Sequence, residues 1–260
     1  MNTTFVRRDN LDKNIAILTL NDTSCRNAMS EKMATDFSAR ITELRSEGDV
    51  RVLIIKGAGD VFSAGGHLDM LLEKPKMSEE RNRQLMEVFY KQFLSIIDIE
   101  IPVIAAINGH AIGAGLCLTL GCDIRIAVES AKVGFNFVRI GLHPGMGATH
   151  LLPRLIGSGY AAELLYTGKI IGANDAAKIG LINHSVGQEQ FDTFVNEMAT
   201  SIAQASPQAV RQLKSSLRTN PLIPLSDSLK REAQCQAADY AGNEFKEGIN
   251  AIIEKRSPRF

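Results

Sequence analysis

The sequence predicts an α/β fold with a helical C-terminal region. Three observations indicate it: apolar strand-like runs alternate with amphipathic segments, two of the runs end in glycine-rich turns, and strand-like runs stop after about Gln188. Such alternation is typical of a sheet that is covered by helices. At 260 residues the chain is long enough for one large domain, or for one domain with an appendage.

The first hundred residues supply much of the predicted core. Residues 15–20 form a buried apolar run that is typical of a strand, and Ser30 is placed to cap the helix that follows. The apolar positions of that helix lie three or four residues apart and form one stripe, which consists of Met33, Phe37, Ile41 and Leu44. We expect a second strand at 52–55 and a helix over 79–97.

The later elements continue the same alternation. We expect a strand at 102–107, a short buried helix at 114–120, a strand at 124–128, helices near 149–156, 160–166 and 174–179, and a strand at 182–186. Beyond this point the pattern is helical, and helix starts or breaks are marked by Pro207, Pro221 and Pro224. These patterns suggest a core of residues 1–195 and a helical region of residues 196–260.

Composition narrows the classes of function. Lys plus Arg and Asp plus Glu both number 29, so the formal net charge is zero, which weighs against a general nucleic-acid binder. Hydrophobic residues make up 45% of the chain, which excludes a disordered protein. No apolar run reaches the roughly 18–20 residues that a membrane span needs, and residues 1–12 lack the apolar centre of a secretory signal. We therefore expect a cytoplasmic protein.

The four cysteines do not suggest a metal site. They are Cys25, Cys117, Cys122 and Cys235, and their spacing matches no metal-binding motif. Free thiols in a reducing compartment are the simplest interpretation. From the spacing alone, no metal is expected.

Two glycine-rich segments, residues 61–68 and 108–116, point to a binding site for negative charge. Each follows an apolar run and leads towards a predicted helix. The first turn of a helix leaves N–H donors without partners, so two such junctions facing one another would form an oxyanion hole. Either segment alone is more typical of an ordinary turn. The spacing of Gly109, Gly113 and Gly115 does not fit a dinucleotide-binding loop.

Several motifs in the same order resemble the crotonase (enoyl-CoA hydratase/isomerase) superfamily. The resemblance extends from about Ile15 to the C-terminus, and its anchors are residues 26–30, 62–68, 101–123, 137–147, 245–248 and 254–256. It implies the crotonase fold of repeated ββα units, with residues 196–260 mediating assembly into trimers or dimers of trimers. It also implies an acyl-CoA substrate and no separate cofactor.

The resemblance assigns roles to individual positions. The backbone N–H groups of Gly66 and Ala114 would donate to the thioester carbonyl oxygen. The CoA channel would be lined by residues around Arg26, Ala28, Ala64 and Leu68, with a contribution from Lys255, which a neighbouring subunit could supply. Arg26 would either pair with a CoA phosphate or be a solvated surface residue.

The sequence departs from the hydratases of this superfamily at both catalytic glutamates. Alignment through the motifs places these glutamates at Cys117 and Phe137. Cys117 is either a nucleophile or, more simply, a small buried hydrophobic residue. Phe137 is better interpreted as a wall for an acyl or aryl group, with Phe135 near it on the same strand and Asn136 between them. Ordinary hydration by two glutamates is therefore disfavoured.

Two histidines are candidates for proton transfer. His67 occupies the position after the first oxyanion donor, where the superfamily commonly has aspartate. It would either exchange protons or hold the loop by a hydrogen bond. His143 stands before Pro144 where an apolar residue is usual, and acid/base and packing roles both remain open.

Two classes of function follow. The first is an acyl-CoA enzyme that stabilises a thioester enolate, for hydration, isomerisation, decarboxylation or another lyase reaction. The second is a non-catalytic acyl-CoA-binding or scaffold protein. RNA binding, which some crotonase relatives show, is disfavoured by the balanced charge.

Overall fold

The computed structural model describes residues 4–260 and contains two sheets. The larger sheet has the strand order β1-β2-β3-β5-β7-β10 and consists of β1 (Val6–Asp12), β2 (Ile15–Leu20), β3 (Val52–Gly57), β5 (Val103–Ile107), β7 (Ile124–Val128) and β10 (His184–Val186). The smaller sheet has the order β4-β6-β8-β9 and consists of β4 (Val61–Ser63), β6 (His110–Ile112), β8 (Lys132–Gly134) and β9 (Ile170–Gly172).

The two sheets are built from a repeated unit. The consecutive pairs β3–β4, β5–β6 and β7–β8 each place their first strand in the larger sheet and their second in the smaller sheet. Neighbouring first strands pair in parallel, as do β4 with β6 and β6 with β8. A helix follows each pair, so the structure confirms the predicted ββα units.

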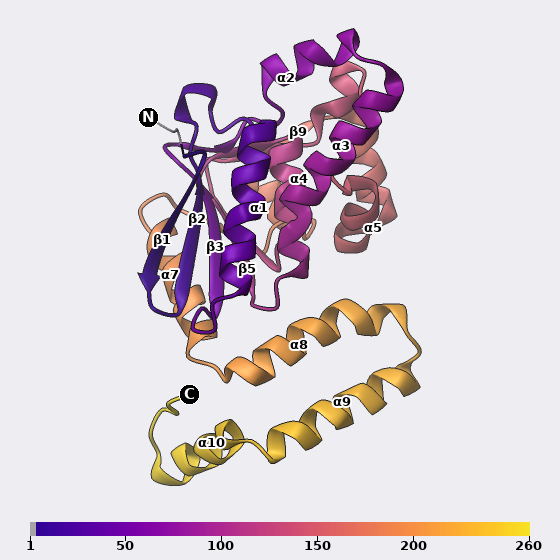
Figure 1. The fold of residues 1–260 in the computed structure, drawn as a ribbon. Helices are drawn as coiled ribbons and strands as arrows, with labels where there is room; N and C mark the ends of the chain where they lie inside the picture. Colours follow the sequence, from indigo (N-terminus) through magenta and orange to yellow (C-terminus); the bar gives the residue numbers. More distant parts are fainter. Residues whose placement is uncertain (1–3) are drawn as a thin grey trace.

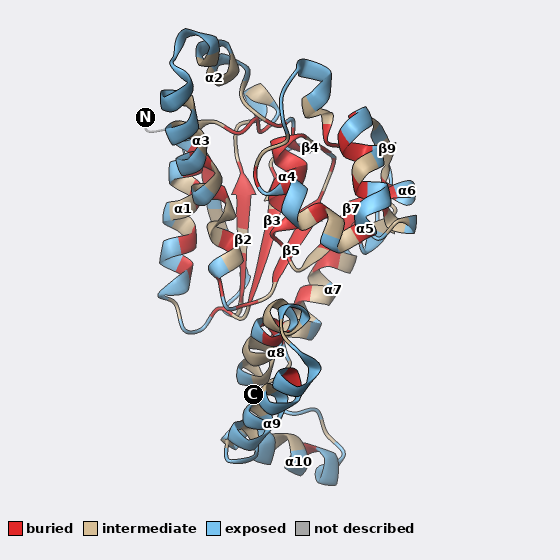
Figure 2. Ribbon diagram, turned by 90° about the vertical axis from the view of Figure 1, so that its right-hand side faces the viewer, coloured by how far each residue is buried: buried red, intermediate tan, exposed pale blue. Residues whose placement is uncertain are grey.

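Helices cover both faces of the larger sheet. The α-helices of the described residues, of which the last three lie away from the sheets, are α1 (Glu31–Arg45), α2 (Leu68–Glu73), α3 (Glu79–Leu94), α4 (Ala114–Leu120), α5 (Ala148–Thr167), α6 (Ala173–Lys178), α7 (Phe191–Ala203), α8 (Pro207–Thr219), α9 (Leu225–Tyr240) and α10 (Asn243–Glu254). Figures 1 and 2 show α1 beside α3 on one side of this sheet and α7 on the other. In the part of the chain that is described, no helix is both long and apolar enough to span a membrane.

The predicted stripe of α1 forms part of the hydrophobic core, coloured red in Figure 2. All four of its residues are buried, and Ser30 caps the helix by accepting a hydrogen bond from the Met33 N–H. Phe37 packs on Phe93 of α3, with their ring centroids 5.3 Å apart. Burying one such side chain contributes about 1.5–3 kcal/mol.

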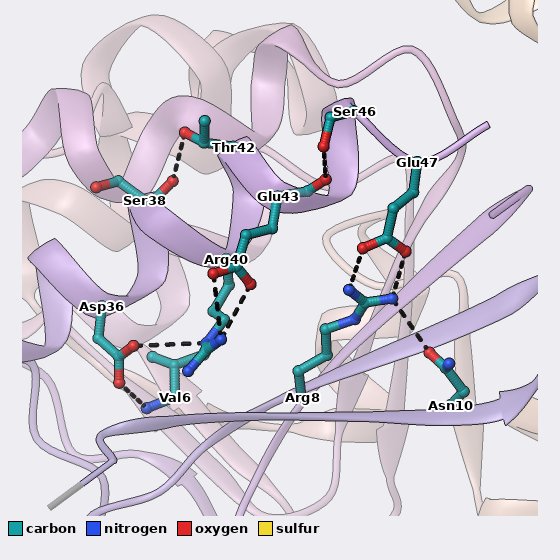
Figure 3. Close-up of polar contacts among 10 residues, drawn as sticks. All are labelled: Val6, Arg8, Asn10, Asp36, Ser38, Arg40, Thr42, Glu43, Ser46 and Glu47. Atoms are coloured by element: carbon teal, nitrogen blue, oxygen red, sulfur yellow. Dashed lines mark hydrogen bonds and ion pairs between the residues drawn. The ribbon is translucent and has the colours of Figure 1, made fainter. Parts of the chain in front are cut away.

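Strand β1 was not among the expected strands. Its exposed charges hide the alternation of a strand, and such charges protect the edge of a sheet from pairing with another chain. Figure 3 shows how β1 is held against α1: the Val6 N–H donates to Asp36 at 2.8 Å, and the Arg8 guanidinium donates to Glu47. The hydrogen bonds from Arg8 lower the pKa of the Glu47 carboxyl.

The last three helices extend away from the sheets (Figure 1). Helix α7, which includes the expected division at residue 195, packs its buried residues on the larger sheet. Helix α8 is fixed to the core through Asp123, which pairs with Lys214 at 2.8 Å and with Arg218 at 3.3 Å. Helices α9 and α10 continue from α8 with many exposed apolar side chains.

Candidate functional site

The first glycine-rich segment is held beside the turn that precedes α1. The Ala64 N–H donates to the Arg26 carbonyl at 3.0 Å, and the Met29 N–H donates to the Gly65 carbonyl at 2.6 Å. The His67 N–H then donates to the Met29 carbonyl at 3.0 Å. Position 66 lies between these bonds, and its own N–H donates to no acceptor among residues 4–260.

Asn27 and Ser63 fix this arrangement. The buried Asn27 amide accepts from the Asp22 N–H at 2.9 Å and donates to the carbonyls of Ala58 and Val61, each at 2.8 Å. The Ser63 hydroxyl donates to the Asn27 carbonyl at 2.8 Å. Asn27 belongs to a motif that the sequence analysis identified, but its supporting role becomes visible only when the turn and β4 are brought together.

The second segment ends at the start of α4. Gly113 adopts φ 54° and ψ −121°, and its N–H donates to the Gly134 carbonyl at 2.8 Å. Ala114 is the first residue of α4, and within the described residues its N–H has no acceptor. At the other end of α4, the buried Arg125 guanidinium donates to the carbonyls of Thr119 and Cys122. The Arg125 cation stabilises the negative, C-terminal end of the α4 dipole. The positive, N-terminal end of this dipole lies at Ala114.

The two segments are in direct contact. A Cβ atom at Gly65 would lie 2.9 Å from the Ile112 carbonyl oxygen and 3.7 Å from the Ala114 nitrogen. A Cβ atom at Gly115 would lie 2.6 Å from the Ser63 Cβ, which real structures do not tolerate. Glycine at these two positions therefore lets the junctions approach each other. Two free N–H donors on adjoining segments are the arrangement that binds a developing oxyanion.

Phe137 lies beside this arrangement. A Cβ atom at Gly113 would meet the Asn136 Oδ1 at 3.1 Å and the Phe137 Cζ at 3.9 Å. The expectation that Phe135 and Phe137 share a strand is wrong: β8 ends at Gly134, and a 3-10 helix covers Asn136–Ile140. The turn sends the Phe135 ring fully into the core and leaves Phe137 half-buried.

Cys117 lies one turn into α4 and is fully buried. Burial raises the pKa of its thiol, which keeps the sulfur protonated at neutral pH. A buried, protonated thiol is a poor nucleophile. The geometry therefore fits a small apolar residue in the core.

The structure places the other candidate residues in different surroundings. The His67 Nδ1 accepts from the Asp69 N–H at 3.2 Å and caps α2, whereas the following Leu68 is 65% exposed. His143 is exposed, and its Nδ1 lies 2.7 Å from the Pro144 carbonyl oxygen. Lys255 ends α10, at the opposite end of the molecule from α2 (Figure 1). Within one chain, Lys255 is thus not brought to the site.

Tyr90 of α3 lies near the site, although no sequence pattern predicted it. Its hydroxyl lies against Gly145, where a Cβ atom would be 2.4 Å from the Tyr90 Oη. Burial raises the pKa of Tyr90. The helical periodicity of 79–97 does not distinguish Tyr90 from its neighbours, so no local signal marks it.

Comparisons with known proteins identify the family of this chain. The sequence profile of the enoyl-CoA hydratase/isomerase family matches residues 10–260. The chain is 34% identical over 250 residues to crotonyl-CoA hydratase of Syntrophomonas wolfei, covering 96% of this chain and 95% of that protein. It is 33% identical over 254 residues to human enoyl-CoA hydratase domain-containing protein 2, mitochondrial, covering 96% and 86%.

Solved structures show the same relationship. The crystal structure of an enoyl-CoA hydratase from Bacillus anthracis has a TM-score of 0.93 and 34% identity, with 98% of each chain covered. An enoyl-CoA hydratase from Polaromonas sp. JS666 has a TM-score of 0.92 at 28% identity, again with 98% of each chain covered. The chain has the crotonase fold and belongs to the enoyl-CoA hydratase/isomerase family.

Proposed function

We propose that this chain is an enzyme that acts on CoA thioesters by stabilising an enolate. The thioester carbonyl oxygen would accept hydrogen bonds from the N–H groups of Gly66 and Ala114. The observation that carries this proposal is that both N–H groups lack acceptors within residues 4–260, although the two segments are in contact. The names of the relatives, among them a crotonyl-CoA hydratase, support the ligand class.

The chemistry follows from where charge develops. When an enolate forms, the carbonyl oxygen gains negative charge, and fixed N–H donors stabilise it more strongly than they stabilise the neutral thioester. The N-terminal end of α4 adds its positive partial charge at Ala114. Losing one such donor typically costs about 3 kcal/mol of transition-state stabilisation.

The side chains favour a reaction that needs no carboxylate at positions 117 and 137. Burial keeps the Cys117 thiol protonated, and Phe137 cannot transfer a proton. If a carboxyacyl-CoA lost CO₂, the electrons of the breaking C–C bond would form the enolate directly. Hydration by two glutamates needs side chains at positions 117 and 137 that transfer protons. Such a decarboxylation, or a related lyase reaction, forms the enolate without them.

Turnover of an acyl-CoA panel tests the proposal. The panel should include enoyl-, 3-hydroxyacyl- and carboxyacyl-CoA thioesters, with products identified by mass spectrometry. Ala114→Pro removes the N–H at the first helical position, where proline is well tolerated, and the ψ of Gly113 lies outside the region that a following proline disfavours. We expect this variant to lose about 10²–10³-fold in kcat.

A matched control introduces the same residue elsewhere. Glu79→Pro places proline at the first position of α3, after Ser78 in an extended conformation. This variant should retain activity. Unchanged turnover in Ala114→Pro, or no turnover of any thioester by the wild type, would contradict the proposed function.

The residues at positions 117 and 137 also favour a second candidate, a non-catalytic acyl-CoA-binding protein. It predicts tight binding of an acyl-CoA without conversion. Installing glutamate at both Cys117 and Phe137 provides a contrast. If the native chain outperforms this double variant on its own substrate, lost catalysis is the wrong explanation.

We also propose that α8–α10 join copies of this chain, as expected from the resemblance. These helices expose large apolar side chains, which include Leu213, Leu217, Leu225, Leu229, Ile252 and Ile253. A hollow of about 440 Å³ lies beside them and is lined in part by Phe245, Ile249 and Phe260. Light scattering coupled to size exclusion should give a trimer or a hexamer, and a monomer would contradict this assembly.

A further inference from the structure

Three side chains that the proposed function does not use lie together beside the turn at Gly66. A carboxylate oxygen of Asp22, the sulfur of Cys25 and a ring nitrogen of His67 all lie within 4.8 Å of one another. Within residues 4–260, none of the three side chains forms a hydrogen bond or ion pair with another. We propose that they form a binding site for a thiophilic divalent cation, for which Zn²⁺ is the best fit.

The ligand set and its spacing suit zinc. Thiolate, imidazole and carboxylate are the side-chain groups that bind Zn²⁺, with bonds of about 2.0–2.3 Å in a tetrahedral arrangement. Ligand atoms in such a site lie about 3.5 Å apart, so the three side chains would rotate towards one another when the cation binds. Three protein ligands leave a fourth position for water or an exogenous donor.

The backbone holds the three ligands in place before a cation binds. The Cys25 N–H donates to the Asp22 carbonyl at 3.1 Å, which places both residues on one tight turn. Asn27 ties this turn to the first glycine-rich segment through the Val61 carbonyl, and the His67 N–H donates to the Met29 carbonyl. The two segments that carry the ligands are therefore locked together. The spacing of the cysteines could not predict this site, because only one of its ligands is a cysteine. The other two are Asp22 and His67, and His67 is distant in the sequence.

Metal binding would change some of the hydrogen bonds that neighbouring groups form with the three ligands. The Ser24 hydroxyl donates to the Asp22 Oδ1 at 2.7 Å and can continue to orient that carboxylate. The His67 Nδ1 accepts from the Asp69 N–H, so in the neutral ring the hydrogen is on Nε2. A cation at Nδ1 displaces the Asp69 N–H, whereas a cation at Nε2 moves the ring hydrogen to Nδ1. In both cases the Asp69 N–H loses its acceptor.

Protection of Cys25 from alkylation by bound Zn²⁺ tests the site in the wild-type chain, without any substitution. Cys25 and Cys235 are both partly exposed, but Cys235 lies on α9, so it serves as an internal control. Saturating Zn²⁺ should slow alkylation of Cys25 by at least about tenfold and leave Cys235 unchanged. Hydrogen exchange of the Asp69 amide should become faster in the same samples. Equal alkylation of Cys25 with and without Zn²⁺ would overturn the proposal.

Co²⁺ substitution identifies the ligands. One equivalent of Co²⁺ per chain should produce a thiolate charge-transfer band, which Zn²⁺ abolishes. Cys25→Ser should eliminate the band, Asp22→Asn should weaken Zn²⁺ binding by at least about tenfold, and Cys235→Ser should do neither. A band that survives in folded Cys25→Ser, or disappears in Cys235→Ser, would refute the site. These metal readouts do not depend on which reaction the chain catalyses.

Discussion

The backbone of Gly65 lies directly against the backbone at Ala114. A Cβ atom at position 65 would lie 3.7 Å from the Ala114 nitrogen, in van der Waals contact, and would clash with the Ile112 carbonyl oxygen at 2.9 Å. The position of each oxyanion donor therefore depends on the other segment. The site therefore forms only where the two turns meet, and neither turn forms it alone.

Gly65→Ala tests this contact. Gly65 has φ +98°, so alanine there is strained and also meets the Ile112 carbonyl. We expect the free energy of unfolding to fall by about 1–3 kcal/mol and acyl-CoA binding to weaken. Denaturant titration and calorimetry measure the two effects.

Gly157→Ala is the matched control, because Gly157 has φ +78° with nothing within 4 Å of its Cβ position. With ψ 159° this residue is in a region that almost only glycine adopts, so the substitution should cost about 1–3 kcal/mol and leave binding intact. If both variants bind acyl-CoA like the wild type, the contact does not shape the site.

Phe137→Ala tests whether this ring bounds the acyl group. Removing a ring that lies near Gly113 opens space beside the oxyanion donors. We expect the affinity ratio of long to short saturated acyl-CoA to rise by about tenfold, since such contacts contribute about 1–3 kcal/mol. Val138→Ala changes a more exposed neighbour on the same turn and should leave the ratio unaltered. An unchanged ratio in Phe137→Ala would exclude it as an acyl wall.

The buried thiols should make the fold sensitive to alkaline pH. Burial raises the pKa of the Cys117 thiol and raises that of Cys122 from 9.0 to about 12. As the pH rises above about 9, the unfolded chain loses thiol protons that the native chain keeps. The free energy of unfolding should then fall, by up to about 1.4 kcal/mol per pH unit for each thiol.

Denaturant titrations between about pH 8.5 and about pH 10.5 measure this slope. Cys122→Ala should decline less steeply than the wild type, because it retains only the Cys117 contribution. Identical slopes would show that the Cys122 thiol ionises as readily in the native state as in the unfolded chain.

Asp123→Asn should destabilise the attachment of α8. The Asp123 carboxylate pairs with Lys214 at 2.8 Å and accepts the Val103 N–H at 2.8 Å. Lys214 is only 6% exposed, so the substitution leaves a buried ammonium without its counterion. Breaking such a pair typically costs about 3–5 kcal/mol.

Asp175→Asn removes the partner of Lys178 in an exposed pair and should cost less than about 1 kcal/mol. Chemical denaturation compares the two variants. An Asp123→Asn variant as stable as Asp175→Asn would mean that the buried ion pair does not hold α8.

Local patterns predicted many elements because the required information lies within a few residues. The Ser30 cap, the apolar stripe of α1 and the buried runs at 114–120 and 124–128 all appear where the sequence placed them. Strand β1 escaped prediction because its edge charges mask the strand pattern. Phe137 was assigned to a strand because the change to a 3-10 helix after Gly134 depends on tertiary packing.

The same distinction applies to the site. The glycine-rich junctions indicated only that free N–H groups occur in each segment, and the resemblance assigned the donors to Gly66 and Ala114. Their proximity was only an expectation from the resemblance, because no local pattern determines how two turns meet. Tyr90 and the Asp22–Cys25–His67 cluster depend entirely on contacts between distant segments, so they became visible only in the fold.

Isotope-edited infrared spectroscopy of a bound, unreactive acyl-CoA, labelled with ¹³C at the thioester carbonyl, tests the central claim most directly. Two N–H donors should shift the carbonyl stretch to lower frequency than in water, and Ala114→Pro should reverse part of the shift. A carbonyl frequency that equals the value in water for the wild-type complex would contradict the account.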